Sequence, residues 1–106
     1  MSLSWRRYEI LLPLRFKDGR AVPRDWFDDA VAEIVGRFGG ASHETQRVRG
    51  RWTKDGVLHH DSMSRIVVDV PDDDANRAWM KTFKERWQAR TAEDQIWLTS
   101  HPIDVE

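Results

Sequence analysis

Three adjacent polar residues, His59, His60 and Asp61, form the cluster in this chain that most resembles a catalytic or metal-binding site. In an extended strand, successive side chains point to opposite faces, so His59 and Asp61 would share a face while His60 points away. Together with Asp69 or Glu9, this pair could hold a divalent cation for phosphodiester chemistry. Asp61 and Asp69 are eight residues apart, about 26 Å along one strand, so they could share an ion only across a dimer.

Two interpretations of this cluster stay open. In the first, His59 and Asp61 act with Arg65 as catalytic residues of a small metal-dependent or nuclease-like enzyme whose site forms at a dimer interface. In the second, the tripeptide is a solvated part of a hairpin, and the protein is not an enzyme and has no metal site and no cofactor. The rest of the sequence favours the second, because it contains neither a phosphate-binding glycine loop nor a serine nucleophile motif. A bulge within Val57–Ser64 would exchange the faces of His59 and His60.

A row of alternating arginines, Arg47, Arg49 and Arg51, is the second pattern with a chemical meaning. No acidic residue lies between Arg47 and Lys54, and guanidinium groups along one strand face suit the phosphate backbone of nucleic acid. We expect this row on the sheet face that no helix covers. An RNA-recognition sheet, however, presents aromatic residues on its central strands, where this sequence places charged and aliphatic ones. The alternative role of the arginines is to pair with acids or to protect an edge strand from aggregation.

The hydrophobic spacing predicts the elements that must position these residues. Alternating apolar residues predict four strands, and the second and third form a long hairpin that turns at Asp55-Gly56. Apolar residues three and four apart predict two helices, one opening at Pro23 and ending at Gly39-Gly40, the other following Asp72-Asp73-Asp74. The predicted strands span Arg6–Phe16, His43–Trp52, Val57–Val70 and Gln95–Ser100, and the last could continue past Pro102 to Val105.

This order, β-α-β-β-α-β, predicts an α+β fold of the ferredoxin-like, split β-α-β kind as a single domain over residues 1–106. Right-handed crossovers would place both helices on one face of a four-stranded antiparallel sheet. The long hairpin would then project past the helices. A stripe of aromatic residues at helical spacing, Trp79, Phe83 and Trp87, is expected in the core rather than in a ligand pocket.

Three strings carry a resemblance to a known family: Tyr8 to Leu14 (YEILLPL), Arg37 to Gly40 (RFGG) and Ile96 to Ser100 (IWLTS). With them, the chain resembles a family of small uncharacterised bacterial proteins of similar length and ferredoxin-like fold. The resemblance covers nearly the whole chain and implies a fold and a bacterial origin. It implies no activity and no site residues.

By alternation, the uncovered sheet face carries an apolar patch of Leu11, Val67 and Trp97, together with Arg65 and other charged residues. Association of two copies through this face would bury the patch, and the arginines would pair with carboxylates of the second copy across a two-fold axis. A solvated face with scattered apolar residues is the alternative. The leading prediction is therefore a homodimeric, non-enzymatic binding or assembly module, with another protein or nucleic acid as the alternative partner.

Composition excludes several classes of protein. Of the 106 residues, 40% are hydrophobic and six are tryptophan, which is typical of one folded domain rather than of a disordered chain. The longest apolar run, Ile10 to Leu14, is too short to cross a membrane, and the absence of cysteine excludes disulfides and thiolate chemistry. A net charge of −1 gives no general attraction to nucleic acid or to membranes. No apolar signal segment opens the sequence, so the predicted location is the cytoplasm.

Overall fold

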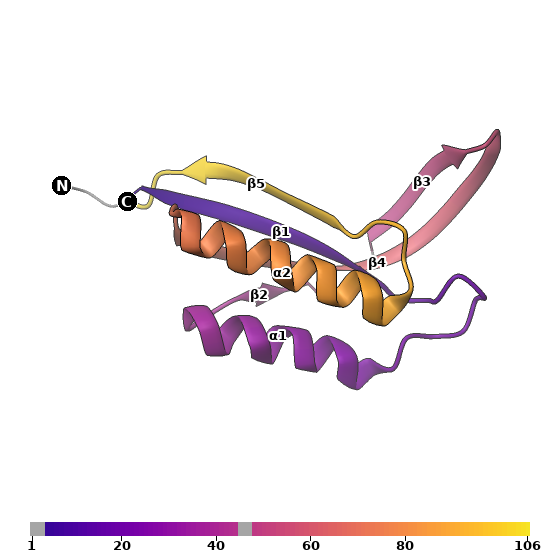
Figure 1. Cartoon of the computed structure of the whole chain (residues 1–106), viewed down its shortest axis with the longest axis horizontal. Helices are drawn as coiled ribbons and strands as arrows, with labels where there is room; N and C mark the ends of the chain where they lie inside the picture. Colours follow the sequence, from indigo (N-terminus) through magenta and orange to yellow (C-terminus); the bar gives the residue numbers. More distant parts are fainter. Residues whose placement is uncertain (1–3, 45–47) are drawn as a thin grey trace.

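The computed structural model describes residues 4–44 and 48–106, with residues 59–61 described by their backbone alone. The described residues form two helices and five strands (Figure 1). In chain order the elements are β1 (Trp5–Pro13), α1 (Arg24–Phe38), β2 (Ser42–His43), β3 (Val48–Lys54), β4 (Val57–Pro71), α2 (Asp74–Thr91) and β5 (Trp97–Ile103). Within this description, no helix is both long enough and apolar enough to cross a membrane.

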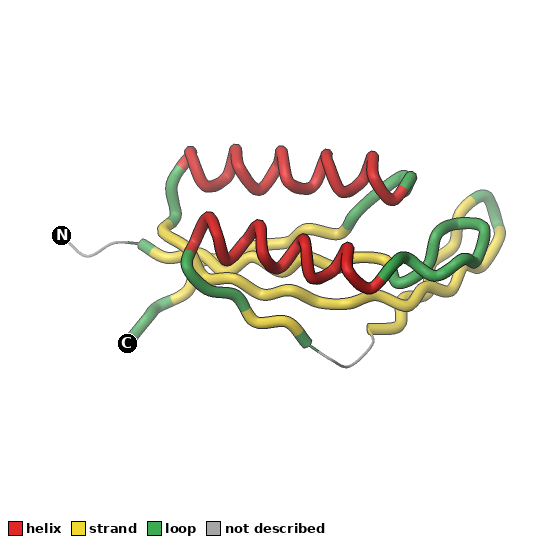
Figure 2. Tube along the Cα trace, turned by 90° about the horizontal axis from the view of Figure 1, so that it is seen from below, coloured by secondary structure: helices red, strands yellow, loops and turns green. Residues whose placement is uncertain are grey.

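The strands form one antiparallel sheet in the order β2-β4-β1-β5, and β3 pairs with the outer half of β4. Both helices lie on one side of the sheet (Figure 2), which confirms the predicted α+β arrangement and leaves the other side uncovered. The prediction of four strands is wrong, because the strand expected over His43–Trp52 is divided into β2 and β3. His43 pairs with Ile66, and Val48 pairs with Met63. The segment from His43 to Val48 is longer than the segment of β4 from Met63 to Ile66, so the two strands fall out of step and the ladder is interrupted.

The long strand β4 belongs to two regions. Residues 63–71 of β4 pair with β1, whose ladder ends where Pro13 lies opposite Met63, and one further backbone hydrogen bond of 2.9 Å follows, from the Leu14 N–H to the Ser62 carbonyl oxygen. Beyond Ser62, the pairing of β4 among the described residues is with β3 alone, as a two-stranded ribbon that rises away from the rest of the sheet (Figure 1). We call this ribbon, β3 with residues 57–62 of β4, the arm, and the rest of the molecule the body. The arm turns at Asp55 and Gly56, whose φ angles of 52° and 76° are the left-handed conformation expected of this dipeptide.

The core lies between the sheet and the two helices. The side chains of β1 and β4 that alternation predicts to point inward are all buried: Tyr8, Ile10, Leu12, Ile66, Val68 and Val70. A line of aromatic rings, each contacting the next, crosses the helical layer: Phe16, Trp26, Trp87, Phe83, Trp79 and Phe38. Edge-on and stacked contacts of this kind add to the stabilisation from burial. The predicted core role of Trp79, Phe83 and Trp87 is thereby confirmed.

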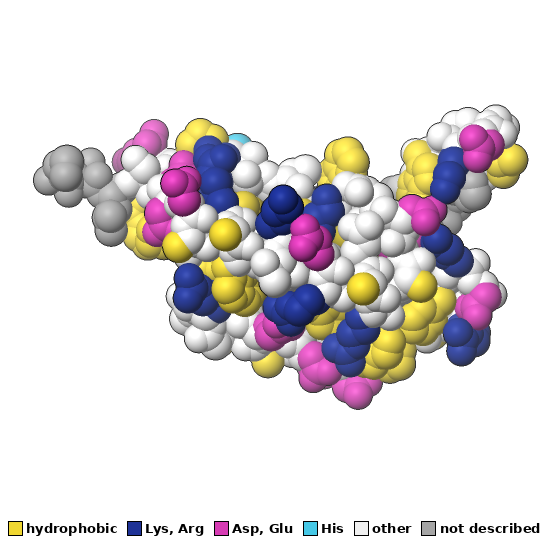
Figure 3. Space-filling view, viewed as in Figure 1, with side chains coloured by type: hydrophobic (Ala, Val, Ile, Leu, Met, Phe, Trp, Pro, Cys, Tyr) yellow, Lys and Arg dark blue, Asp and Glu magenta, His cyan; other side chains and the backbone are white. Residues whose placement is uncertain are grey.

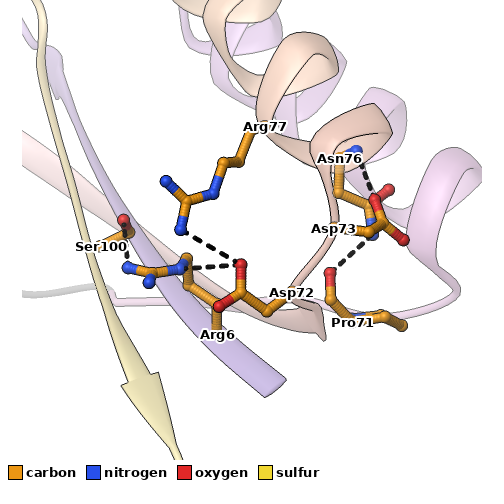
Figure 4. Close-up of polar contacts among 7 residues, drawn as sticks. All are labelled: Arg6, Pro71, Asp72, Asp73, Asn76, Arg77 and Ser100. Atoms are coloured by element: carbon orange, nitrogen blue, oxygen red, sulfur yellow. Dashed lines mark hydrogen bonds and ion pairs between the residues drawn. The ribbon is translucent and has the colours of Figure 1, made fainter. Parts of the chain in front are cut away.

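Polar contacts fix the start of α2 against the sheet (Figure 4). The Asp73 side chain accepts a hydrogen bond of 2.7 Å from the backbone N–H of Asn76, which is the N-cap contact that the acidic run predicts. Arg6 of β1 and Arg77 of α2 both pair with Asp72, at 3.1 and 3.3 Å. The contact with Arg6 is the main reason that the pKa of Asp72 lies below its ordinary value. These two arginines are therefore occupied within the chain.

Candidate association surface and candidate site residues

The sheet face opposite the helices, called the open face here, is fixed by strand register. On this face β1 carries Arg7, Glu9 and Leu11, β4 carries Arg65, Val67 and Asp69, and β5 carries Trp97, Thr99 and His101. Trp97 lies opposite Leu11 on the neighbouring strand, and 58% of its surface is exposed. Leu11 and Val67 are half-buried. The structure therefore brings the three apolar residues predicted for an interface to the same face of the sheet.

The charged residues of the open face pair within the chain. Arg7 donates hydrogen bonds of 2.8 and 3.0 Å to the two carboxylate oxygens of Asp69, and this bonding is the main reason that the pKa of Asp69 is lowered. Arg65 lies 3.3 Å from Glu44 and 4.0 Å from Glu9. Within one chain, cross-strand and edge neighbours already supply carboxylates to these arginines, as the alternative role of the arginines predicts, and pairing across a two-fold axis stays a prediction. No surplus of positive charge remains on this face of the body.

An apolar strip continues from the open face onto the arm. Met63 lies on the same side of the sheet as Leu11. Its partner in the ladder with β3 is Val48, which comes two residues before Gly50 in the sequence. A side chain at Gly50 would meet the Met63 Cε atom at 2.8 Å and the Trp52 ring at 3.2 Å, so both side chains lie over this glycine. Trp52 is 42% exposed. In Figure 3, hydrophobic side chains stand out above the body and again on the arm, and the outline of the molecule dips between them.

The arginine row does not lie where the sequence analysis placed it. Arg49 pairs with Ser62 and Arg51 with His60, and residues directly opposite in an antiparallel ladder point to the same side. Both arginines therefore lie on the side of the arm opposite Met63, away from the open face. Their assignment to the open face is wrong, because alternation shows which residues share a face but only register shows which face it is. Arg47 lies outside the described residues.

The candidate catalytic residues are spread along one strand. His59 and Asp61 occupy β4 opposite Trp52 and Gly50, and their side chains lie outside the description. Arg65 is six residues from His59 on the same strand, about 20 Å in an extended chain, and its guanidinium group is already engaged by carboxylates of the body. In the described part of the chain, no group of three or more histidine or acidic residues is placed to hold a metal ion.

One contact that the sequence analysis did not foresee joins His43 of β2 to Ser64 of β4. The His43 Nε2 atom lies 2.5 Å from the Ser64 hydroxyl oxygen, and Ser64 is buried. A hydroxyl beside an imidazole is the first element of a nucleophilic site, which also needs a group that orients the histidine. Among the described residues, none contacts the other nitrogen of the His43 ring. The contact therefore fastens the short strand β2 to β4, and no local sequence signal marks it, since the two residues are 21 positions apart.

A second unforeseen contact ties the arm to the body. Asp94, between α2 and β5, binds Lys17 at 2.9 Å and Lys54, at the end of β3, at 2.8 Å. The two ammonium groups lower the pKa of Asp94 to about 2, with the hydrogen bond from Lys54 as the largest cause. One carboxylate thus joins the arm to two loops of the body.

Comparison with known proteins gives a fold. No family model matches the chain, and no curated protein matches it. Among solved structures, a phage SAM lyase in complex with S-methyl-5'-thioadenosine is 12% identical with a TM-score of 0.69, over 100% of this chain and 94% of that one. CutA1 from Oryza sativa is 8% identical with a TM-score of 0.67, over 99% and 84%. The divalent ion tolerance protein CutA1 from Ehrlichia chaffeensis is 6% identical with a TM-score of 0.64, over 100% and 87%. At these identities, the similarity shows that the chain shares a small α+β fold with these proteins.

Proposed function

We propose that this protein is a non-enzymatic binding or assembly module that associates with a second copy of itself through the open face and the adjoining side of the arm. The observation that carries the proposal is the apolar strip formed by Leu11, Trp97, Met63, Val48 and Trp52 beside charges that are already paired within the chain. On the body, such a surface offers apolar area beside charges that need no partner from a second copy. A homodimer, a cytoplasmic location and a bacterial origin stay predictions of the sequence.

The shape of the chain supports this proposal. Its accessible surface is 7275 Å², whereas a compact monomer of this mass would expose about 6200 Å². Its radius of gyration is 14.7 Å, against about 13 Å for a compact domain of this length. The arm is the visible source of this extension (Figure 1). An interface of standard size covers about 800 Å² per partner, and the arm extends the open face lengthwise.

The energetics are favourable for association through the strip. Burial of apolar surface contributes roughly 25 cal/mol per Å², so covering Trp97 and its neighbours would contribute a few kcal/mol per copy. Charged residues at the centre of an interface usually oppose association unless they are paired. Here Arg7 and Asp69 bring their own partners, so on the open face of the body the second copy would have to supply apolar contact but no new counter-charge for this pair.

The test is the mass of the protein in solution, measured by size-exclusion chromatography with light scattering over a hundredfold range of concentration. We expect the wild type to associate, and Trp97→Glu to be monomeric at concentrations where the wild type is not. The matched control is Val35→Glu, at a residue of α1 that is 40% exposed on the helical side of the molecule, and we expect it to associate like the wild type. A monomeric wild type, or equal loss of association in both variants, would refute the proposal.

A further inference from the structure

The arm has two chemically different sides. On β3, the side continuous with the open face carries Val48, Gly50 and Trp52, with His59 and Asp61 of β4 at the ladder positions opposite Trp52 and Gly50, and the other side carries Arg49 and Arg51. The nucleic-acid and self-association interpretations of the sequence both placed their residues on one sheet face, where they would compete. Register separates them onto opposite sides of the same ribbon, so use of one side leaves the other accessible.

Arg49 and Arg51 differ from most arginines of the body in having no partner among the described residues. Among the described residues outside the arm, each arginine except Arg24 pairs with, or donates to, another group of the chain. Arg49 and Arg51 are exposed, and no described side chain lies within hydrogen-bonding or ion-pair distance of either. As far as the described residues show, they are therefore uncompensated positive charges, whereas the arginines of the body are mostly paired with neighbours.

The arm holds these two charges in a fixed relation. Residues two apart on a strand are about 7 Å apart and point the same way, and the ladder with β4 prevents the chain from turning one of them away. The ladder positions on their side from Arg49 to Ser62 contain no acidic residue. The result is a local positive surface despite the net charge of −1. Guanidinium groups are planar, permanently charged and able to donate two hydrogen bonds to one phosphate.

We propose that the arginine side of the arm binds the phosphodiester backbone of nucleic acid without reading its bases. Arg49 and Arg51 would each donate to a phosphate. Sequence-specific recognition of single strands needs aromatic side chains on which bases stack, and the ladder places Trp52 on the opposite side of the arm. Binding is therefore independent of base sequence, weak for one chain, and strongly dependent on salt. This proposal does not depend on self-association, although two arms in one assembly would bind one strand more tightly than either alone.

The test is fluorescence anisotropy of a labelled oligothymidylate at low salt with wild type, with Arg49→Gln/Arg51→Gln, and with Arg24→Gln/Lys81→Gln. The last variant is the matched control, because it removes the same charge from two exposed residues of the body that form no ion pair with any other described residue. Loss of two phosphate contacts should weaken binding roughly tenfold and reduce the slope of log K against log salt by about 1.4. The control should bind like the wild type, and circular dichroism should show that all three are folded.

Three results would overturn the proposal. One is no binding of the wild type to the oligothymidylate or to a duplex of the same length at low salt. Another is equal weakening in the arm variant and the control, which would indicate a general effect of net charge. The third is arm-dependent binding to vesicles containing phosphatidylserine with no binding to either nucleic acid, which would assign the arginines to an anionic membrane surface. A difference between single strand and duplex would identify the form of backbone that is bound.

Discussion

The body and the arm share one strand, β4, but are stabilised in different ways. In the body, residues 63–71 of β4 lie between neighbouring strands, and every second side chain is buried against helices. In the arm, residues 57–62 have one neighbouring strand and no covering layer. Val57 and Leu58, near the tip, are both 57% exposed. An isolated two-stranded ribbon is marginally stable in water, so the conformation of the arm depends on its continuity with the body and on the Asp94 contacts.

The two regions also differ in whether their charged side chains are paired within the chain. Surface charges of the body are largely paired, as with Arg90, which bonds to Asp29 and lies over the rings of Trp26 and Trp87. In the arm, two arginines have no partner among the described residues, and apolar side chains are exposed on the opposite side of the ribbon. A region that stabilises the fold satisfies its own groups, whereas a region with unsatisfied groups is available for a partner. This contrast is why both proposals concern the arm.

The largest expected difference between the regions concerns aromatic side chains. Phe83 is fully buried in the ring line, so Phe83→Ala should lower the free energy of unfolding by about 3–5 kcal/mol. Trp52→Ala, in the arm, should lower it by less than about 1 kcal/mol, as for an exposed site. Urea unfolding followed by far-ultraviolet circular dichroism measures both. A cost for Trp52→Ala that approaches that of Phe83→Ala would show that the arm is packed as tightly as the body.

A smaller effect is expected at the start of α2. Asp73→Ala removes the acceptor for the Asn76 N–H and should cost about 1 kcal/mol. Asp74→Ala is the control, because Asp74 is the first residue of the helix and its side chain makes no hydrogen bond with any described residue. Thermal and urea unfolding of the two variants should rank them in this order. Equal losses would mean that attraction to the helix dipole, rather than the cap, stabilises this end.

The contact between arm and body predicts a dependence on acid. The pKa of Asp94 is about 2 in the folded protein and about 4 in an unfolded chain. A lowered pKa means that the ionised form stabilises the fold, so this contribution is complete above about pH 4 and is lost as the pH falls towards 2. The stability difference between wild type and Asp94→Asn should therefore shrink over this range in thermal unfolding. Asp104→Asn, which removes a carboxylate that has no ion pair among the described residues, should show no such trend.

The smallest effect is expected on the open face. Arg7 and Asp69 form a two-bond pair, but both side chains are more than one-third exposed. Exposed pairs contribute about 0–1 kcal/mol, so Arg7→Gln should change the free energy of unfolding by less than about 1 kcal/mol in urea titrations. Added salt should reduce the difference further. A larger loss would mean that this pair is shielded from water in solution, as association through the open face would bring about.

Much of the fold follows from local patterns in the sequence. The apolar stripe of α1, the left-handed Gly39 after it, the acidic cap of α2 and the Asp55-Gly56 turn each depend on neighbours within a few residues, and the structure contains all of them. The inward residues of β1 and β4 follow equally from alternation. Local propensity and periodicity are properties of short segments, so they can be derived from the chain without knowledge of its folded neighbours.

Tertiary structure alone decided how the segments meet. The division of the second predicted strand, and with it the side on which Arg49 and Arg51 lie, depends on the register against β4. The contacts of Asp94 join residues 77 and 40 positions apart. The alternation of residues along a strand shows which side chains share a face, but it is the same whichever face of the sheet they occupy. Pairing of charges depends on distances between residues that are far apart in the sequence. The sequence therefore determined which residues act together along each element, and only packing of the elements determined what each set faces.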